Sequence, residues 1–77
     1  MNNLQQTLEY ILKSIIDDPK DITVEAVEQN NFVNLVVSVP KDKIGQIIGK
    51  QGRIIKSIRS ILGISYPDTR FNLEIKE

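Results

Sequence analysis

The residues with the clearest capacity for chemistry are two glycines that enclose two polar residues between short apolar segments. The sequence reads Ile-Gly-Gln-Ile-Ile-Gly-Lys-Gln-Gly-Arg-Ile-Ile over residues 44–55. Gly49 and Gly52 allow backbone dihedrals that other residues avoid, and they leave no Cβ in the way of an approaching group. Free backbone amides at the start of the helix that follows, together with Lys50 and Arg53, favour an anion. The pattern therefore predicts a phosphate-binding turn.

The charged residues are distributed unevenly along a chain whose formal net charge is zero. The 77 residues include ten Lys or Arg and ten Asp or Glu. Taken alone, a zero total argues against a protein that binds polyanions, because nucleic-acid binders usually show a basic balance. Residues 41–59, however, hold six basic residues and one acidic residue, a net charge of +5, and the remainder carries −5. The basic residues therefore gather around the glycine turn.

The composition excludes several kinds of catalytic and metal site. The chain has no cysteine and no histidine, which removes disulfides, thiolate ligands and the commonest general base. Asp17, Asp18 and Asp21 lack the ligand spacing of a calcium loop, so we expect a solvated turn there. We expect no catalytic residue, no metal and no cofactor.

The glycine pattern also differs from a nucleotide-binding P-loop. Gly45 and Gly49 are separated by three residues rather than four, and Gln51 stands where Ser or Thr is required. A plain turn between two helices, with Gly49 after one and Gly52 before the next, is the simpler alternative. The flanking isoleucines and the order of the predicted elements favour a binding turn.

The N-terminal segment predicts an amphipathic helix. Its apolar residues recur at helical spacing: Leu4, Leu8, Ile11, Leu12, Ile15 and Ile16. Glu9 and Lys13 form an i,i+4 pair outside this face. We expect the helix to end near residues 17–19, because Pro19 cannot continue the hydrogen-bond ladder.

Two segments with alternating apolar residues then predict half-buried strands. The first begins at residue 22 and the second spans residues 32–39. The second strand has four apolar residues on one face: Val33, Leu35, Val37 and Val39. Asn30 and Asn31 between the strands tolerate the left-handed conformation of a tight turn, so we expect an antiparallel hairpin.

The remaining chain predicts two helices and a last strand. Ile44, Ile47 and Ile48 form a short helical segment, and a longer helix begins near Gly52 or Arg53. The longer helix has an apolar face: Ile54, Ile55, Ile58, Ile61 and Leu62. Gly63 is placed to end this helix, and residues 71–75 alternate as a strand.

The order α-β-β-α-α-β predicts an α+β fold with two layers in a single domain, residues 1–77. A strand, helical crossover and strand in one sheet return a parallel strand. We therefore expect a three-stranded mixed sheet with three helices on one face and water or a partner on the other. The first residues contain no targeting signal, and no apolar run approaches the ~20 residues of a membrane span. These features predict a cytoplasmic protein with no membrane contact.

The glycine turn resembles the GxxG loop of the KH domain, which clamps the backbone of about four nucleotides of single-stranded RNA or DNA. Gly49–Gly52 matches the loop, and residues 44–55 match the wider family signature. The order of elements resembles the type II KH arrangement, so the resemblance covers the whole chain. A single type II KH domain of this length is similar to the small bacterial KhpA family of RNA-binding proteins.

The resemblance implies roles for individual residues. The RNA-binding residues that it implies are Gly49, Lys50, Gln51, Gly52, Arg53, Ile44, Gly45, Ile48 and Lys56. The loop residues would hold the sugar-phosphate backbone. Ile44, Gly45, Ile47 and Ile48 would form one wall of an apolar groove for bases, with the glycine keeping that wall low. The opposite wall would come from residues 64–70 and the last strand.

Simpler interpretations remain open for several of these residues. Four isoleucines are better explained by the core than by ligand contact: Ile47, Ile54, Ile55 and Ile58. Lys56 and Arg59 extend the basic helical face but equally suit a solvated helix surface. Tyr66 could stack on a base, although packing on the sheet edge is the simpler expectation.

The sequence therefore predicts a non-enzymatic binder of single-stranded RNA, with single-stranded DNA left open, acting as a post-transcriptional regulator or RNA chaperone. Because one module binds weakly, we expect a homodimer or a heterodimer with another KH-domain protein that is KhpB-like. The alternative is a protein-interaction or dimerisation module with incidental RNA binding. The apolar surplus at Ile16, Ile64 and Tyr66 suggests that alternative.

Overall fold

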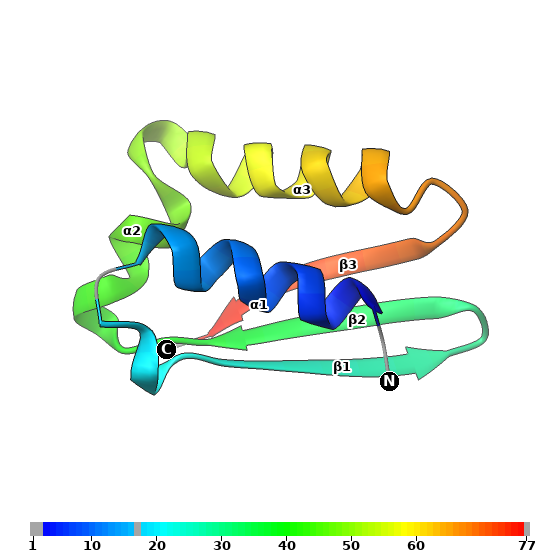
Figure 1. Cartoon of the computed structure of the whole chain (residues 1–77), viewed down its shortest axis with the longest axis horizontal. Coiled ribbons are helices and arrows are strands. Elements are labelled where there is room, and N and C mark those ends of the chain that lie inside the picture. The colour runs from blue at the N-terminus through cyan, green and yellow to red at the C-terminus, as the bar shows by residue number, and fades with distance from the viewer. Residues whose placement is uncertain (1–2, 17, 77) are drawn as a thin grey trace.

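The computed structural model describes residues 3–16 and 18–76, which follow the predicted order α-β-β-α-α-β (Figure 1). The helices and strands are α1 Asn3–Ile15, β1 Thr23–Gln29, β2 Phe32–Ser38, α2 Ile44–Ile48, α3 Arg53–Ser65 and β3 Arg70–Lys76. Three short 3₁₀ turns lie between them: η1 Pro19–Asp21, η2 Lys41–Lys43 and η3 Lys50–Gly52. Asp17, from the acidic turn, lies outside the described residues.

Helix α1 has the predicted amphipathic pattern, with Leu4, Leu8 and Leu12 buried. Glu9 and Lys13 form the predicted i,i+4 ion pair, with the ammonium 3.9 Å from the carboxylate. One residue of the predicted apolar face is not buried, because Ile15 is 44% exposed. Ile15 projects between Leu4 and Leu8 on this face but is the last residue of α1, so its exposure follows from its place at the helix end.

The β1–β2 hairpin turns through Asn30 and Asn31, both of which have positive φ, 53° and 65°. Gln29 pairs with Phe32 across this two-residue turn. Two successive residues of positive φ match the twist of a right-handed hairpin, and asparagine is among the residues that tolerate this conformation. The predicted hairpin is confirmed.

Strand β2 is the central strand of the sheet, which has the order β1-β2-β3. It pairs antiparallel with β1 and parallel with β3. A parallel neighbour requires a crossover, which α2 and α3 provide on the side of the sheet that α1 also covers (Figure 1). The predicted mixed sheet with three helices on one face is confirmed.

The hydrophobic core fills the space between this sheet face and the three helices. Its largest fully buried side chains are Leu4, Leu8, Leu12, Leu35, Ile47, Leu62 and Val37. Every element of the helical layer contributes at least one of them. Each such side chain stabilises the fold by roughly 1.5–3 kcal/mol relative to an exposed one.

The side chain of Tyr66 joins the end of α3 to the start of α1. Its hydroxyl donates to the backbone carbonyl of Asn3 at 3.1 Å and also lies within hydrogen-bond distance of Thr7 Oγ1. Gln5 Nε2 donates to the carbonyl of Val24 at 2.8 Å and ties α1 to β1. Tyr66 is therefore a packing residue, as the simpler interpretation of the sequence expected.

Within the described residues, no helix is long and apolar enough to cross a membrane. The same residues include no cluster of three or more carboxylates, thiols or imidazoles that could hold a metal ion.

The prediction that Gly63 ends the second long helix is wrong. Helix α3 continues to Ser65 and ends where the Tyr66 amide donates to the Leu62 carbonyl at 2.9 Å. A glycine permits a helix end but does not impose one. The burial of Leu62 and the hydrogen bonds of Tyr66 hold the last turn in place. Gly63 is thus an exposed residue in the interior of a helix.

We predict that Gly63→Ala stabilises the protein. A Cβ at this position would meet no atom within 4 Å. Alanine has the highest helix propensity, whereas glycine in a helix interior is less favourable than any residue except proline. The free energy of unfolding, measured by urea titration, should rise by about 0.5–1 kcal/mol. Gly52→Ala is the contrasting variant, because its φ of +73° disfavours a Cβ, and it should lower stability by about 1–2 kcal/mol. Equal effects of the two changes would contradict this explanation.

Candidate nucleic-acid interface

The loop between α2 and α3 has a backbone that depends on its glycines. Helix α2 ends at Gly49, which has φ 76° and ψ 175°, a region that is essentially restricted to glycine. Gln51 and Gly52 follow with φ values of 57° and 73°. Three of the four loop residues thus have positive φ, so the chain reverses direction within the loop.

Gly49 is also required by packing against α3. A Cβ on Gly49 would lie 2.5 Å from Cγ1 of Ile54, far inside the contact distance of two carbon atoms. The absence of a side chain lets Ile54, in the first turn of α3, cover the end of α2. Gly49 therefore fixes the angle between the two helices as well as the path of the loop.

The loop offers fewer free amides than the sequence predicted. The Gly52 amide donates to the Gly49 carbonyl at 3.1 Å, and the Arg53 amide donates to the Lys50 carbonyl. These bonds close the turn internally, so neither donor is available to an anion. The amides of Lys50 and Gln51, at the tip, are the ones that the turn itself does not use.

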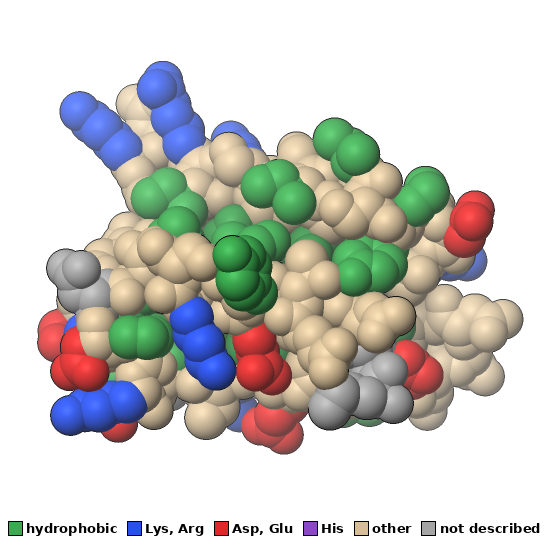
Figure 2. Space-filling view, viewed as in Figure 1, with side chains coloured by type: hydrophobic (Ala, Val, Ile, Leu, Met, Phe, Trp, Pro, Cys, Tyr) green, Lys and Arg blue, Asp and Glu red, His purple; other side chains and the backbone are tan. Residues whose placement is uncertain are grey.

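The cations of the motif lie in the positions that the sequence predicted. Lys50 and Arg53 are exposed, and Lys56 follows one turn later on the same exposed side of α3. Two ion pairs of the described residues, Glu9 with Lys13 and Asp18 with Lys20, lie at α1 and η1, away from the loop. Figure 2 shows Lys and Arg side chains projecting into solvent at this end of the molecule. The loop thus presents unneutralised positive charge.

Helix α2 carries the residues that were predicted to form a low wall beside the loop, and one of them is buried instead. Ile44 is half-buried, Ile48 is 37% exposed, and a Cβ on the exposed Gly45 would meet no atom within 4 Å. Ile47, by contrast, is fully buried and cannot touch a ligand. It faces the core because it lies three residues after Ile44 on the inner side of this one-turn helix. Gly45 and Ile48 are the open part of the wall.

One residue of the wall was assigned to the core by the sequence. Ile54 is 37% exposed beside the loop, whereas Ile58 is buried and Ile55 half-buried as expected. Its position in the first turn of α3, directly after the glycine loop, is the sequence feature that could have indicated this exposure. Ile54 therefore adds an apolar contact next to Lys50 and Arg53.

The two segments predicted to form the opposite wall lie at different distances from the loop. Residues 64–70 lie at the far end of α3, whose 13 residues span about 20 Å at 1.5 Å per residue. They are too distant to hold the same nucleotide as the loop. Strand β3 does reach the loop end, because the Lys76 carbonyl accepts from the Val39 amide just before η2 and α2. The end of β3 is therefore the part that can face α2.

The comparisons with known proteins agree with this geometry. The sequence matches the family described as KhpA/KhpB, KH domain, over residues 5–76. The chain belongs to this KH-domain family. The match includes all of the loop, the walls beside it and the sheet.

Several bacterial relatives share the KhpA name. RNA-binding protein KhpA of Chlamydia pneumoniae is 38% identical over 76 residues, 96% of this chain and 97% of that protein. RNA-binding protein KhpA of Listeria monocytogenes is 34% identical over 76 residues, 96% of this chain and 100% of that protein. The Clostridium acetobutylicum protein of the same name is 39% identical over 59 residues, 77% of this chain and 79% of that protein. No solved structure matches the chain significantly.

We predict that Gly49→Ala destabilises the fold by about 2–4 kcal/mol, the combined effect of backbone strain and overpacking. Urea unfolding measures this loss. If the clash with Ile54 contributes, the same change in an Ile54→Ala background should cost at least 1 kcal/mol less. An identical loss in both backgrounds would show that the dihedral angles of Gly49 alone account for the glycine.

Proposed function

We propose that this protein is a non-enzymatic binder of single-stranded RNA that clamps the sugar-phosphate backbone with Gly49–Gly52. The single observation that carries the proposal is the glycine-dependent loop beside the open wall at Gly45, where Lys50 and Arg53 pair with no carboxylate of the described residues. The names of the relatives, RNA-binding protein KhpA, support RNA as the ligand. Single-stranded DNA is the other ligand that such a clamp fits.

The composition of the interface indicates weak and unselective binding. Phosphate contacts position a strand without reading its sequence. The apolar wall of Ile44, Ile48 and Ile54 suits the faces of bases but offers few groups to distinguish them. A module of this kind suits a post-transcriptional regulator or an RNA chaperone, which must engage many RNAs and release them.

The first test reverses the charge of the loop tip. In Lys50→Asp with Gln51→Asp, both side chains are exposed, and aspartate tolerates the left-handed backbone of residue 51. We expect the fold to survive and the affinity for a short single-stranded RNA to fall at least tenfold. The slope of log K against log salt should also become shallower by about 0.7 for each phosphate that the variant no longer neutralises.

A matched control places the same charge change far from the loop. Lys13→Glu with Ser14→Glu alters two exposed residues of α1 and should leave RNA affinity within about twofold of the unmodified protein, since exposed charges beyond a Debye length are screened. Unchanged RNA binding by the folded loop variant would refute the assignment of the clamp.

A second candidate function, association with another protein chain, is supported by the outer face of α3. Ile61 is 47% exposed and Ile64 is 80% exposed, and with Ile54 they occupy one stripe of the helix. Figure 2 shows apolar side chains along this helix and below it over α1. Of the residues that first suggested such a role, only Ile64 is free to act, because Ile16 is buried and Tyr66 is bonded to α1.

We propose that this stripe pairs with a second copy of the chain. Burial of two isoleucines on each copy would contribute roughly 1.5–3 kcal/mol per side chain, and two linked clamps would raise the effective concentration of one another for a longer RNA. A heterodimer with a KhpB-like KH-domain protein is the alternative arrangement.

We expect Ile61→Gln with Ile64→Gln to convert a dimer to a monomer. The substitutions remove apolar area while the charge and helix propensity of α3 are preserved. Sedimentation equilibrium at micromolar concentration should show the dissociation constant rise at least tenfold. Ser60→Gln, at an exposed position of the same helix outside the stripe, is the control and should remain dimeric. A monomeric unmodified protein would leave only pairing with a different chain.

A further inference from the structure

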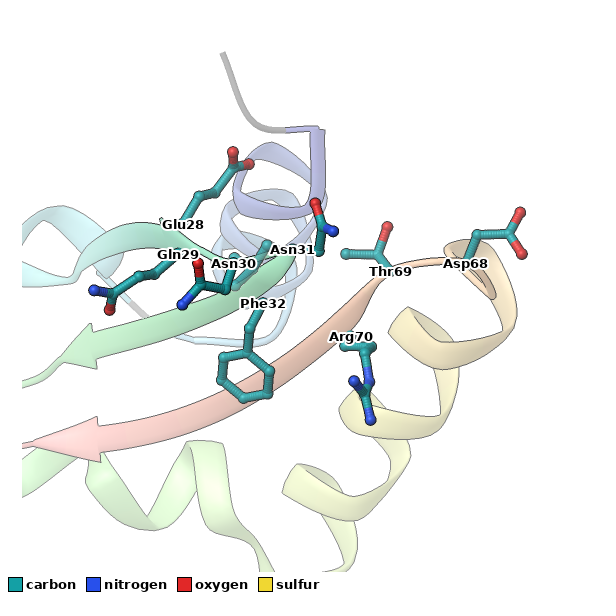
Figure 3. Close-up of a pocket in the computed structure, with 9 residues that line it drawn as sticks. Glu28, Gln29, Asn30, Asn31, Phe32, Asp68, Thr69 and Arg70 are labelled. Carbon is teal, nitrogen blue, oxygen red and sulfur yellow. The ribbon is translucent and has the colours of Figure 1, made fainter.

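A hollow lies at the end of the molecule opposite the glycine loop (Figure 3). It has a volume of about 600 Å³ and is formed by the β1–β2 turn and the segment that enters β3. Its lining consists of Glu28, Gln29, Asn30, Asn31, Phe32, Val33, Asp68, Thr69 and Arg70. The volume is in the range of small-molecule sites.

Phe32 and Arg70 meet on the face of the sheet that the helices leave open. They are partners in the register of β2 and β3, and their neighbours Val33 and Phe71 point toward the core. Asn34 and Asn72, two residues further along, share this open face and are hydrogen-bonded at 2.9 Å. Figure 3 shows the Phe32 ring and the Arg70 side chain directed to the same side.

Both side chains are available to a ligand. Phe32 is 42% exposed. Burial of its phenyl ring against a ligand would contribute favourable free energy. Arg70 is exposed and takes part in no ion pair within residues 3–16 and 18–76. We propose that this Phe32–Arg70 site receives one nucleobase of a single-stranded RNA whose backbone is held at the glycine loop. This inference rests on the proposed function and adds a second contact to it.

The chemistry of the hollow suits a base better than a run of phosphates. The Phe32 ring provides a stacking surface, the Arg70 guanidinium can lie against a base or meet its phosphate, and the carboxamide of Asn30 offers both a donor and an acceptor to a base edge. Glu28 and Asp68 at the rim disfavour several adjacent phosphates. Figure 3 shows the carboxylate of Asp68 directed away from the ring, so the centre of the site keeps the positive charge of Arg70.

The two sites lie at opposite ends of the long axis of the protein (Figure 1). The longest dimension is 34 Å, which a stacked strand would cover with about ten nucleotides at ~3.4 Å each. An RNA of four nucleotides at the loop therefore cannot reach Phe32, whereas one of twelve can. The length of RNA that binds is thus the property that separates the two contacts.

The experiment compares fluorescein-labelled RNAs of four and twelve nucleotides and mixed sequence by fluorescence anisotropy. It uses the Ile61→Gln with Ile64→Gln background, so that one chain binds one RNA. Phe32→Ala and Arg70→Gln should each weaken binding of the dodecamer about tenfold, the lower part of the range for loss of a stacked base. Binding of the tetramer should change by less than twofold. Phe32→Tyr, which keeps an aromatic ring, should retain the affinity for the dodecamer.

Matched controls separate the site from general surface effects. Val27→Ala removes an apolar side chain, 55% exposed, from the same open face outside the hollow, and Lys13→Gln removes one positive charge from α1. Both should bind the dodecamer as the background does. A dodecamer with abasic riboses at the end that reaches the hollow should bind like Phe32→Ala and should be insensitive to that substitution.

The outcomes distinguish this inference from the proposed function. If the background protein binds both RNAs and Phe32→Ala binds the dodecamer equally well, the second site is refuted while the clamp stands. If the background protein binds neither RNA, the clamp is refuted and this inference with it. Unchanged dodecamer binding together with weaker self-association of Phe32→Ala in the unmodified background would assign the open face to a second copy of the chain and overturn the inference.

Discussion

The parallel pairing of β3 with β2 determines where every other part of this molecule lies. Two strands that follow one another in sequence can be parallel only if the chain crosses back along the sheet. Here α2 and α3 make that crossing on the face that α1 also covers. The glycine loop interrupts the crossing at its turning point, so the site lies beside the end of β2, the point where the chain leaves the sheet.

Much of the fold is readable from the sequence because the pattern of apolar residues changes clearly between elements. Alternating apolar residues in 32–39 correctly predicted a strand, and helical spacing in residues 4–16 correctly predicted a helix. Asn30 and Asn31 correctly predicted the hairpin turn. The local sequence pattern did not predict the end of α3, because a contact with a residue far away in the sequence determines where that helix ends. Gly63 remains helical because Tyr66, bonded to a residue 63 positions away, secures the helix end.

The candidate site was predictable in part for the same reason. Glycines that need positive φ and cations beside them are local properties, and Gly49, Gly52, Lys50 and Arg53 lie as expected. Whether the Gly52 amide is hydrogen-bonded depends on how the turn closes. The distance of residues 64–70 from the loop depends on the length of α3. The Phe32–Arg70 site depends on strand register, which no short stretch of sequence specifies.

The hydrogen bonds of Tyr66 have a consequence for how the domain folds. Helix α1 precedes the sheet along the chain, yet its partners include Tyr66, which follows α3 and lies just before the last strand of that sheet. Domains generally fold as units, and synthesis proceeds from the N-terminus. Residues 3–38 therefore have no complete core of their own. During synthesis, the apolar face of α1 must stay available until α3 and β3 have left the ribosome, and only then can these elements pack together.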